Sequence, residues 1–221
     1  MTRVAEALAA LAAQGTEDGR LGMARYGIVA AKAYGVSVAN VRTLAKQLGR
    51  DHDLADALWR TGWYEAHLLA AFVDDPKLVT PAQMDRWSGE FENWADTDTI
   101  CFHLFDKTPH AFAKVDIWAA DEREFVRRAA FALLASVALH DKKAADAPFL
   151  ERLPLIEAAA TDSRNFVKKG VSWALRGIGG RKSPALQAAT RAMADKLATS
   201  ADKTARWIGR DAQKQFAKAD G

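Results

Sequence analysis

The 221 residues include one cysteine, Cys101, which excludes an intramolecular disulfide and a cysteine-rich zinc site and fits a reducing, cytoplasmic setting. No stretch approaches about 18 uncharged apolar residues, so no membrane span is expected. The net charge of +3 hides an asymmetry, because residues 164–218 carry +10 and the rest carries −7. A basic C-terminal third indicates a polyanionic partner, although a merely solvated face would have the same composition.

The predicted elements are all helical. Residues 1–14 alternate alanine and leucine with charged residues, which predicts an amphipathic helix rather than a signal peptide. Thr80-Pro81 and Ser183-Pro184 are typical of helix starts, with the hydroxyl residue as N-cap and proline in the first turn. Gly35 and the pair Gly179-Gly180 are expected to end helices. Apolar residues recur at three- and four-residue spacing, so we expect about twelve helices of roughly 10 to 17 residues and no strand.

An internal repeat covers the second half of the chain. The segment 125–129 (Phe-Val-Arg-Arg-Ala) matches 166–170 (Phe-Val-Lys-Lys-Gly) and, more loosely, 207–211, and the aromatic positions are 41 residues apart both times. A helical period of about 40 to 47 residues is typical of HEAT and armadillo repeats. One position of the repeat is basic in all three copies: Arg128, Lys169 and Arg210. These cations are predicted to form a row that follows a phosphate backbone, unless they pair locally with acids.

Four groups of segments, taken together, resemble the AlkD-type DNA glycosylases of the DNA alkylation repair family. They span most of the chain, in the family's order: Met23–Tyr26 with Gly35-Val36 and Ala39–Lys46; Leu58-Trp59 with Trp63–Ala66; Asn93–Asp98; and Val126–Ala130 with Phe166–Arg176. The resemblance implies an all-α, HEAT-like helical repeat superhelix (an α-α solenoid) with a concave basic face, forming a single domain over residues 1–221.

The resemblance also implies the excision of cationic alkylated purines, such as 3-methyladenine and 7-methylguanine, from double-stranded DNA. The positions that match the family's active cleft are Asp98, Trp94, Arg128 and Trp173. Those expected to contact DNA are Tyr26, Phe166, Lys168, Lys169, Arg176 and Arg210. Two departures stand out: the motif reads Trp-Ala-Asp-Thr-Asp where Trp-Asp-x-x-Asp is commoner, and Asn165 replaces an expected aromatic residue.

These residue types suit the chemistry. An N3- or N7-alkylated purine leaves as a neutral base, and positive charge develops on the deoxyribose. Asp98 can stabilise that charge and orient or deprotonate a water molecule, while Trp94, four residues earlier, projects from the same helical face. Trp173 can form a second wall, and the Arg128 guanidinium suits a phosphate clamp. No polar cluster suited to reading a base edge is apparent.

Each of these residues also has a purely structural interpretation. Asp96 or Asp98 can be an acid that favours a helix N-terminus, Trp94 and Trp173 can belong to the core, and Arg128 can pair within its helix. The histidines lack metal-ligand spacing, so no metal and no cofactor are expected.

Two functional hypotheses of different classes follow. The first is a monofunctional alkylpurine-DNA glycosylase, cytoplasmic and nucleoid-associated, which acts as a monomer without a membrane partner. The second is a non-catalytic HEAT-repeat protein that binds unusual or branched DNA. A scaffold for an acidic protein partner is a weaker third.

Overall fold

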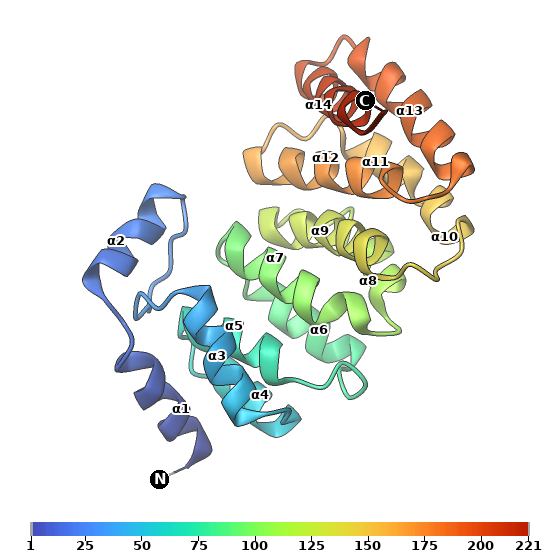
Figure 1. Cartoon of the computed structure of the whole chain (residues 1–221). Helices are drawn as coiled ribbons and strands as arrows, with labels where there is room; N and C mark the ends of the chain where they lie inside the picture. Colours follow the sequence, from blue (N-terminus) through green and yellow to red (C-terminus); the bar gives the residue numbers. More distant parts are fainter. Residues whose placement is uncertain (1, 221) are drawn as a thin grey trace. The chain divides into compact units, whose positions relative to one another are not determined.

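The computed structural model describes residues 2–220 (Figure 1). Within these residues lie fourteen α-helices, one 3₁₀ helix and no strand, so the all-helical prediction is confirmed. Within the same range, no helix combines the length and apolar character needed to cross a membrane. The chain divides into two compact units: unit 1 extends through Thr108 and unit 2 begins at Pro109. Each unit is described by itself.

Unit 1 is built from seven α-helices and a short 3₁₀ helix, most of which start at a side-chain cap. Thr2, Thr16, Ser37, Asp51 and Thr80 each accept a hydrogen bond from a backbone N–H of the first turn. The elements are α1 (Arg3–Ala12), α2 (Glu17–Arg25), α3 (Val38–Leu48), α4 (His52–Trp59), α5 (Tyr64–Val73), α6 (Pro81–Gly89), α7 (Trp94–His103) and η1 (Phe105–Lys107).

Unit 2 combines four long helices with three short ones. Its elements are α8 (Ala111–Trp118), α9 (Glu124–His140), α10 (Ala147–Leu150), α11 (Leu153–Ala159), α12 (Asn165–Gly179), α13 (Pro184–Ala198) and α14 (Lys203–Asp220). The predicted starts at Thr80-Pro81 and Ser183-Pro184 and the predicted stop at Gly179-Gly180 are confirmed. The count exceeds the expected twelve because the structure includes short helices such as α10 and α11, each with a proline in its first turn.

The core of unit 1 is centred on a buried aromatic stack. The Trp59 ring lies between His67 and Trp87, with ring centroids at 4.0 and 4.1 Å and nearly parallel planes. The Trp59 indole N–H donates to the Glu90 carboxylate at 2.8 Å, so its polar edge is satisfied. This stack joins α4, α5 and α6.

The internal repeat corresponds to helices that pack in layers. The helix α9 packs along α12, and α12 packs on α14. The equivalent rings of Phe125 and Phe166 touch, with centroids 5.5 Å apart. In the third copy, Gly209 allows α14 to approach α13, because a Cβ there would lie 2.2 Å from the Ala198 nitrogen. The 41-residue period therefore marks one structural layer of unit 2.

The expectation that Gly35 ends a helix is wrong. The preceding helix, α2, ends at Arg25, and Gly35 lies in the loop before α3 with φ +82°. The fully buried Glu65 carboxylate on α5 accepts the N–H groups of Tyr34, Gly35 and Val36 at 2.7–3.1 Å. A remote side chain, rather than a helix end, therefore fixes this glycine.

Replacing Glu65 with alanine is expected to leave three N–H groups in a largely buried loop without acceptors. Each unsatisfied buried group costs about 1–3 kcal/mol, so the free energy of unfolding should fall by about 3 kcal/mol or more. Urea unfolding measures the loss, and faster hydrogen exchange at residues 34–36 locates it. Glu6→Ala on the exposed side of α1 is the control and should stay within about 0.5 kcal/mol. Unchanged exchange at residues 34–36 would show that Glu65 does not hold the loop.

Candidate functional site

The start of α7 is fixed by a reciprocal capping box. The Asn93 side-chain oxygen accepts the N–H groups of Ala95 and Asp96 at 2.9 and 3.1 Å, and the Asp96 carboxylate accepts the Asn93 N–H at 3.3 Å. Asp96 is almost completely buried and also accepts the Thr97 N–H at 2.6 Å. Asp96 is therefore the acid that belongs to the helix N-terminus.

Asp98 lies two residues farther into α7, about one turn after Trp94. It is the fifth residue of the helix, and Asp96 is the acid of the first turn. The Asp98 side chain is half-buried, and the capping box does not include it. The interpretation of Asp98 as a cap residue is therefore wrong, while the same interpretation is confirmed for Asp96.

The N-cap residue Asn93 and the first helical residue, Trp94, join α7 to the loop after α2. The Trp94 indole N–H donates to the Tyr26 carbonyl at 2.9 Å, and Asn93 Nδ2 donates to the Val29 carbonyl at 3.4 Å. The Tyr26 side chain is 73% exposed. Trp94 is half-buried and acts as an anchor for this loop, so the structure brings Tyr26 and Trp94 together on the surface of unit 1.

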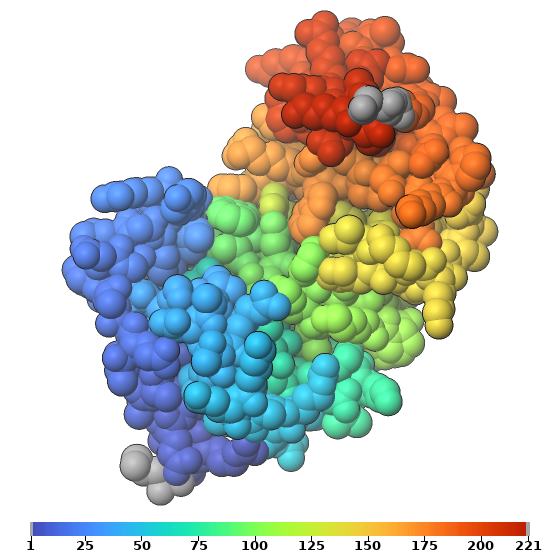
Figure 2. Space-filling model, in the orientation of Figure 1, coloured from blue at the N-terminus to red at the C-terminus, as the bar shows by residue number. Residues whose placement is uncertain are grey.

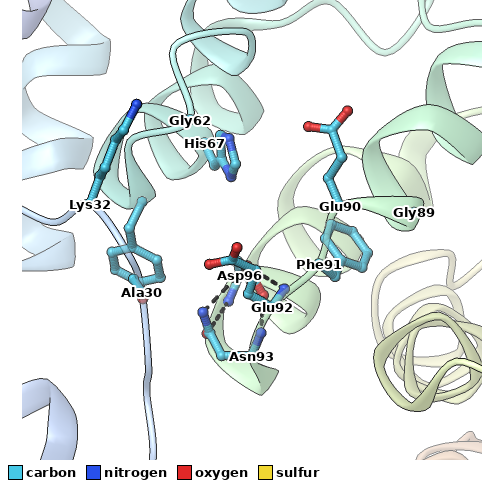
Figure 3. Close-up of a pocket in the computed structure, with 11 residues that line it drawn as sticks. Ala30, Lys32, Gly62, His67, Gly89, Glu90, Phe91, Glu92, Asn93 and Asp96 are labelled. Atoms are coloured by element: carbon cyan, nitrogen blue, oxygen red, sulfur yellow. Dashed lines mark hydrogen bonds between the residues drawn. The ribbon is translucent and has the colours of Figure 1, made fainter.

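A cavity of about 330 Å³ lies beside the capping box, within unit 1 (Figure 3). Its polar lining includes Lys32, Tyr64, His67, Glu90 and Asp96. Figure 3 shows the Asp96 carboxyl group directed into this space, with His67 across from it. The sequence analysis missed this polar cluster, although Tyr64 and His67 are spaced to share one face of α5.

Burial sets the protonation of these groups. Burial raises the pKa of Asp96 to about 7, although the backbone N–H groups of Glu92, Thr97 and Asn93 oppose the shift. Burial also lowers the pKa of His67 to about 4, so this imidazole is neutral at neutral pH. Burial and, to a smaller extent, the neighbouring Asp96 carboxylate raise the pKa of Tyr64. Three groups of the cavity lining, Tyr64, His67 and Asp96, therefore stay neutral or titrate near pH 7.

In unit 2, helix α12 carries four of the predicted DNA-contacting residues and the predicted cleft residue Trp173, while Arg210 lies on α14. Phe166, Lys169 and Trp173 are spaced to lie on one helical face, and their side chains are half-buried or exposed. Lys168 lies toward α14, with its ammonium 4.6 Å from the centre of the Trp207 ring. Arg176 also reaches α14, because its Nε lies 3.2 Å from an Asp211 carboxylate oxygen. Lys168 and Arg176 therefore join two layers of the stack in addition to carrying positive charge.

The predicted row of three exposed cations is wrong at its first member. Lys169 and Arg210 are exposed, but Arg128 is only 6% exposed. One Arg128 guanidinium nitrogen donates to the Phe166 carbonyl at 2.6 Å. The start of α12 covers Arg128. The side chain at this repeat position is therefore exposed in the later layers, as Lys169 and Arg210, but in the first layer it forms a hydrogen bond between two layers.

A pair of acid–arginine turns was missed in the sequence. Asp121 and Arg123 form a two-nitrogen ion pair before α9, and Asp162 and Arg164 form the same pair before α12. These arginine hydrogen bonds lower the pKa of both carboxyl groups. Arg164 also donates to the Glu122 carbonyl at 2.6 Å, which ties the two turns together. The repeated Asp-x-Arg, 41 residues apart, was the available signal.

The sequence-predicted residues thus fall into two groups. Unit 1 holds Tyr26, Trp94 and Asp98, and unit 2 holds Arg128, Phe166, Lys168, Lys169, Trp173, Arg176 and Arg210.

The family model of the DNA alkylation repair enzymes matches residues 7–216. The chain belongs to this family. The match covers both units, including the α7 residues and the layered helices α9, α12 and α14. No curated protein sequence matches the chain.

A solved structure is similar in fold. It represents a new family of proteins related to the HEAT-like repeat DNA glycosylases with affinity for branched DNA structures. The TM-score is 0.82 at 18% identity, over 99% of this chain and 95% of the other. The predicted HEAT-like repeat fold of this DNA alkylation repair family member is therefore confirmed.

The Asp96 carboxyl group gives unit 1 a distinct pH dependence. Because its pKa rises from 3.8 to about 7 on folding, the folded protein holds this proton more tightly than the unfolded chain. The stabilising contribution is complete below the unfolded pKa and is lost as the pH rises through about 7.

Carboxyl-carbon NMR should therefore find the Asp96 midpoint near pH 7, and the free energy of unfolding should fall between about pH 4 and pH 7. The Asp96→Asn variant has no carboxyl group at this position, so its free energy of unfolding, measured with urea, should depend less on pH. An Asp96 midpoint near 4 would contradict the buried environment.

Proposed function

We propose that this protein is a monofunctional alkylpurine-DNA glycosylase. It hydrolyses the bond between deoxyribose and a cationic N3- or N7-alkylated purine in duplex DNA and leaves an abasic site. The observation that carries the proposal is the position of Asp98, one turn after Trp94 on α7 and outside the capping box. The membership of the chain in the DNA alkylation repair enzyme family supports it.

The proposed step needs few groups. The bond from the sugar C1′ to the purine nitrogen breaks, and its electron pair leaves with the base, which becomes neutral. Positive charge then develops on the sugar, where the Asp98 carboxylate stabilises it. A water oxygen bonds to C1′, and its proton passes to Asp98 or to solvent. Trp94 holds the Tyr26 loop against the start of α7, one turn before Asp98.

Unit 2 supplies the charge that holds the duplex. Lys169 and Arg210 are exposed on successive layers, and both suit contacts with phosphate oxygens. Phe166 and Trp173 share the Lys169 face of α12 and are proposed to contact the same duplex. Because the family match covers both units, we propose that they act as one functional module. We further propose that the protein acts on DNA as a monomer within the cytoplasm.

Incubation with duplexes that contain 7-methylguanine or 3-methyladenine tests the proposal directly. The expected result is free alkylated base and an abasic site, without strand cleavage. Intact substrate after prolonged incubation with folded protein would leave the second candidate, a non-catalytic protein for branched DNA. The affinity of the similar solved protein for branched DNA structures favours that candidate.

Replacing Asp98 with asparagine is expected to lower the rate of 7-methylguanine excision by about 100-fold or more, because one preorganised charge is lost. Affinity for undamaged duplex should stay within a few-fold or rise, since a carboxylate near phosphates repels them. Asp96→Asn is the matched control, because it alters an acid on the same helix: it should affect stability far more than excision per folded molecule. If Asp98→Asn lowers only stability, Asp98 is structural.

Binding to undamaged duplex is expected to weaken steeply with salt. Lys169→Ala should flatten the slope of log affinity against log salt by about one unit at most, because it removes one phosphate contact. Arg128→Ala should leave that slope unchanged and lower the melting temperature, because it removes an interlayer hydrogen bond. Fluorescence anisotropy and thermal melting measure the two effects. A flattened slope in the Arg128 variant would contradict the interlayer role.

A further inference from the structure

The aromatic residue of the repeat is more exposed on α14 than in the earlier layers. The rings of Phe125 and Phe166 are half-buried against each other, but Trp207, at the same repeat position, is 40% exposed. Figure 2 shows α14, in dark red, at the surface of unit 2. Exposing an indole is unfavourable in water, and tryptophan is frequent where one ring face receives a ligand.

This indole lines an open groove of about 440 Å³. It is lined by Trp207, Asp211 and four cationic residues, namely Lys203, Arg206, Arg210 and Lys214.

Among the described residues that line the groove, Asp211 is the one acid, and residues of α12 engage its carboxylate. The Asp211 carboxylate accepts the Ser172 hydroxyl at 2.6 Å and lies 3.2 Å from Arg176 Nε. Arg206 donates to the backbone carbonyls of Ser200 and Ala201, which hold its guanidinium without cancelling its charge. The groove is therefore strongly cationic.

Lys168 adds a further cation at the ring itself. Its ammonium lies 4.6 Å from the centre of the Trp207 ring, on the side of α12. This contact orients the indole and leaves two-fifths of the residue accessible.

An aromatic side chain within a row of cations is typical of surfaces that bind single-stranded nucleic acid. The cations follow the backbone, and the ring stacks on a base. A base in an intact duplex is stacked on its neighbours and cannot also stack on a side chain, whereas an unpaired base can. The exposed indole therefore distinguishes this groove from a surface that binds only duplex backbone.

We propose that the α14 groove binds an unpaired segment of a DNA strand, with a base stacked on Trp207. The proposal rests on the DNA binding put forward above and adds a substrate class, namely duplexes that carry a single-stranded tail or branch. Lys203 and Lys214 contact the phosphates of that segment, and the stack on Trp207 is tolerant of base identity.

Fluorescence anisotropy with the full chain and two labelled probes tests the proposal. One probe is a blunt, undamaged duplex, and the other is the same duplex with a single-stranded thymidine tail. The wild-type protein should bind the tailed probe about five-fold or more tightly than the blunt one. Trp207→Ala should abolish this preference and leave affinity for the blunt probe nearly unchanged, while Trp207→Phe, which keeps an aromatic face, should retain most of it.

The matched control is Ile117→Ala, which removes another exposed apolar side chain of unit 2, on α8, and should preserve the preference. Thermal melting verifies that each variant is folded. Equal affinity of the wild type for both probes would overturn the proposal and leave duplex binding intact. If Trp207→Ala lowered the affinity for both probes equally, the proposal would also be overturned, because the ring would then belong to the surface that binds duplex. A failure to bind either probe would instead reject the DNA-binding function itself.

Discussion

The capping box between Asn93 and Asp96 is the constraint on which the proposed chemistry depends. It fixes where α7 begins, and the start of the helix sets the direction in which Trp94 and Asp98 project. Asn93 and Trp94 also bind the carbonyls of Val29 and Tyr26, so the same few residues hold the loop after α2. Two acids two residues apart thus differ in position: Asp96 belongs to the capping box at the helix start, and Asp98, to which we propose a catalytic role, lies outside it.

The layered helices of unit 2 show how one repeat position acquires different functions. Arg128 lies beneath the start of α12 and donates to a backbone carbonyl there, whereas Lys169 and Arg210 remain exposed. Phe125 and Phe166 are half-buried in contact with each other, but Trp207 on the last described layer is exposed. Position in the stack thus affects whether the side chain at a given repeat position joins layers or lies at the surface.

Local signals in the sequence predicted the fold well. Thr80-Pro81 and Ser183-Pro184 specify helix starts through their own side chains and backbone restriction, so the surrounding fold cannot easily override them. The prediction for Gly35 failed because its conformation depends on Glu65, thirty residues away in the chain. The burial of Arg128 depends likewise on Phe166, in the next layer. Contacts between distant segments are not visible in local sequence patterns.

The candidate site was predictable only in part. The resemblance to the glycosylase family points to Asp98 and Trp94, whose roles stay a prediction, and the capping box gives Asp96 a structural role. The cavity lined by Tyr64, His67 and Asp96 could not be predicted, because α5 and α7 meet only in the folded unit.

The central claim is that the Asp98 carboxylate stabilises positive charge on the sugar. The most direct test compares the affinities of the protein for two duplexes, one with a cationic pyrrolidine in place of the damaged nucleotide and one with a neutral tetrahydrofuran. Mimics of a transition state bind at least about 100-fold more tightly than ground-state ligands when the charge is recognised. The account predicts a clear preference for the pyrrolidine duplex that disappears in Asp98→Asn. Equal affinity for the two duplexes, or a preference that survives the substitution, would contradict it.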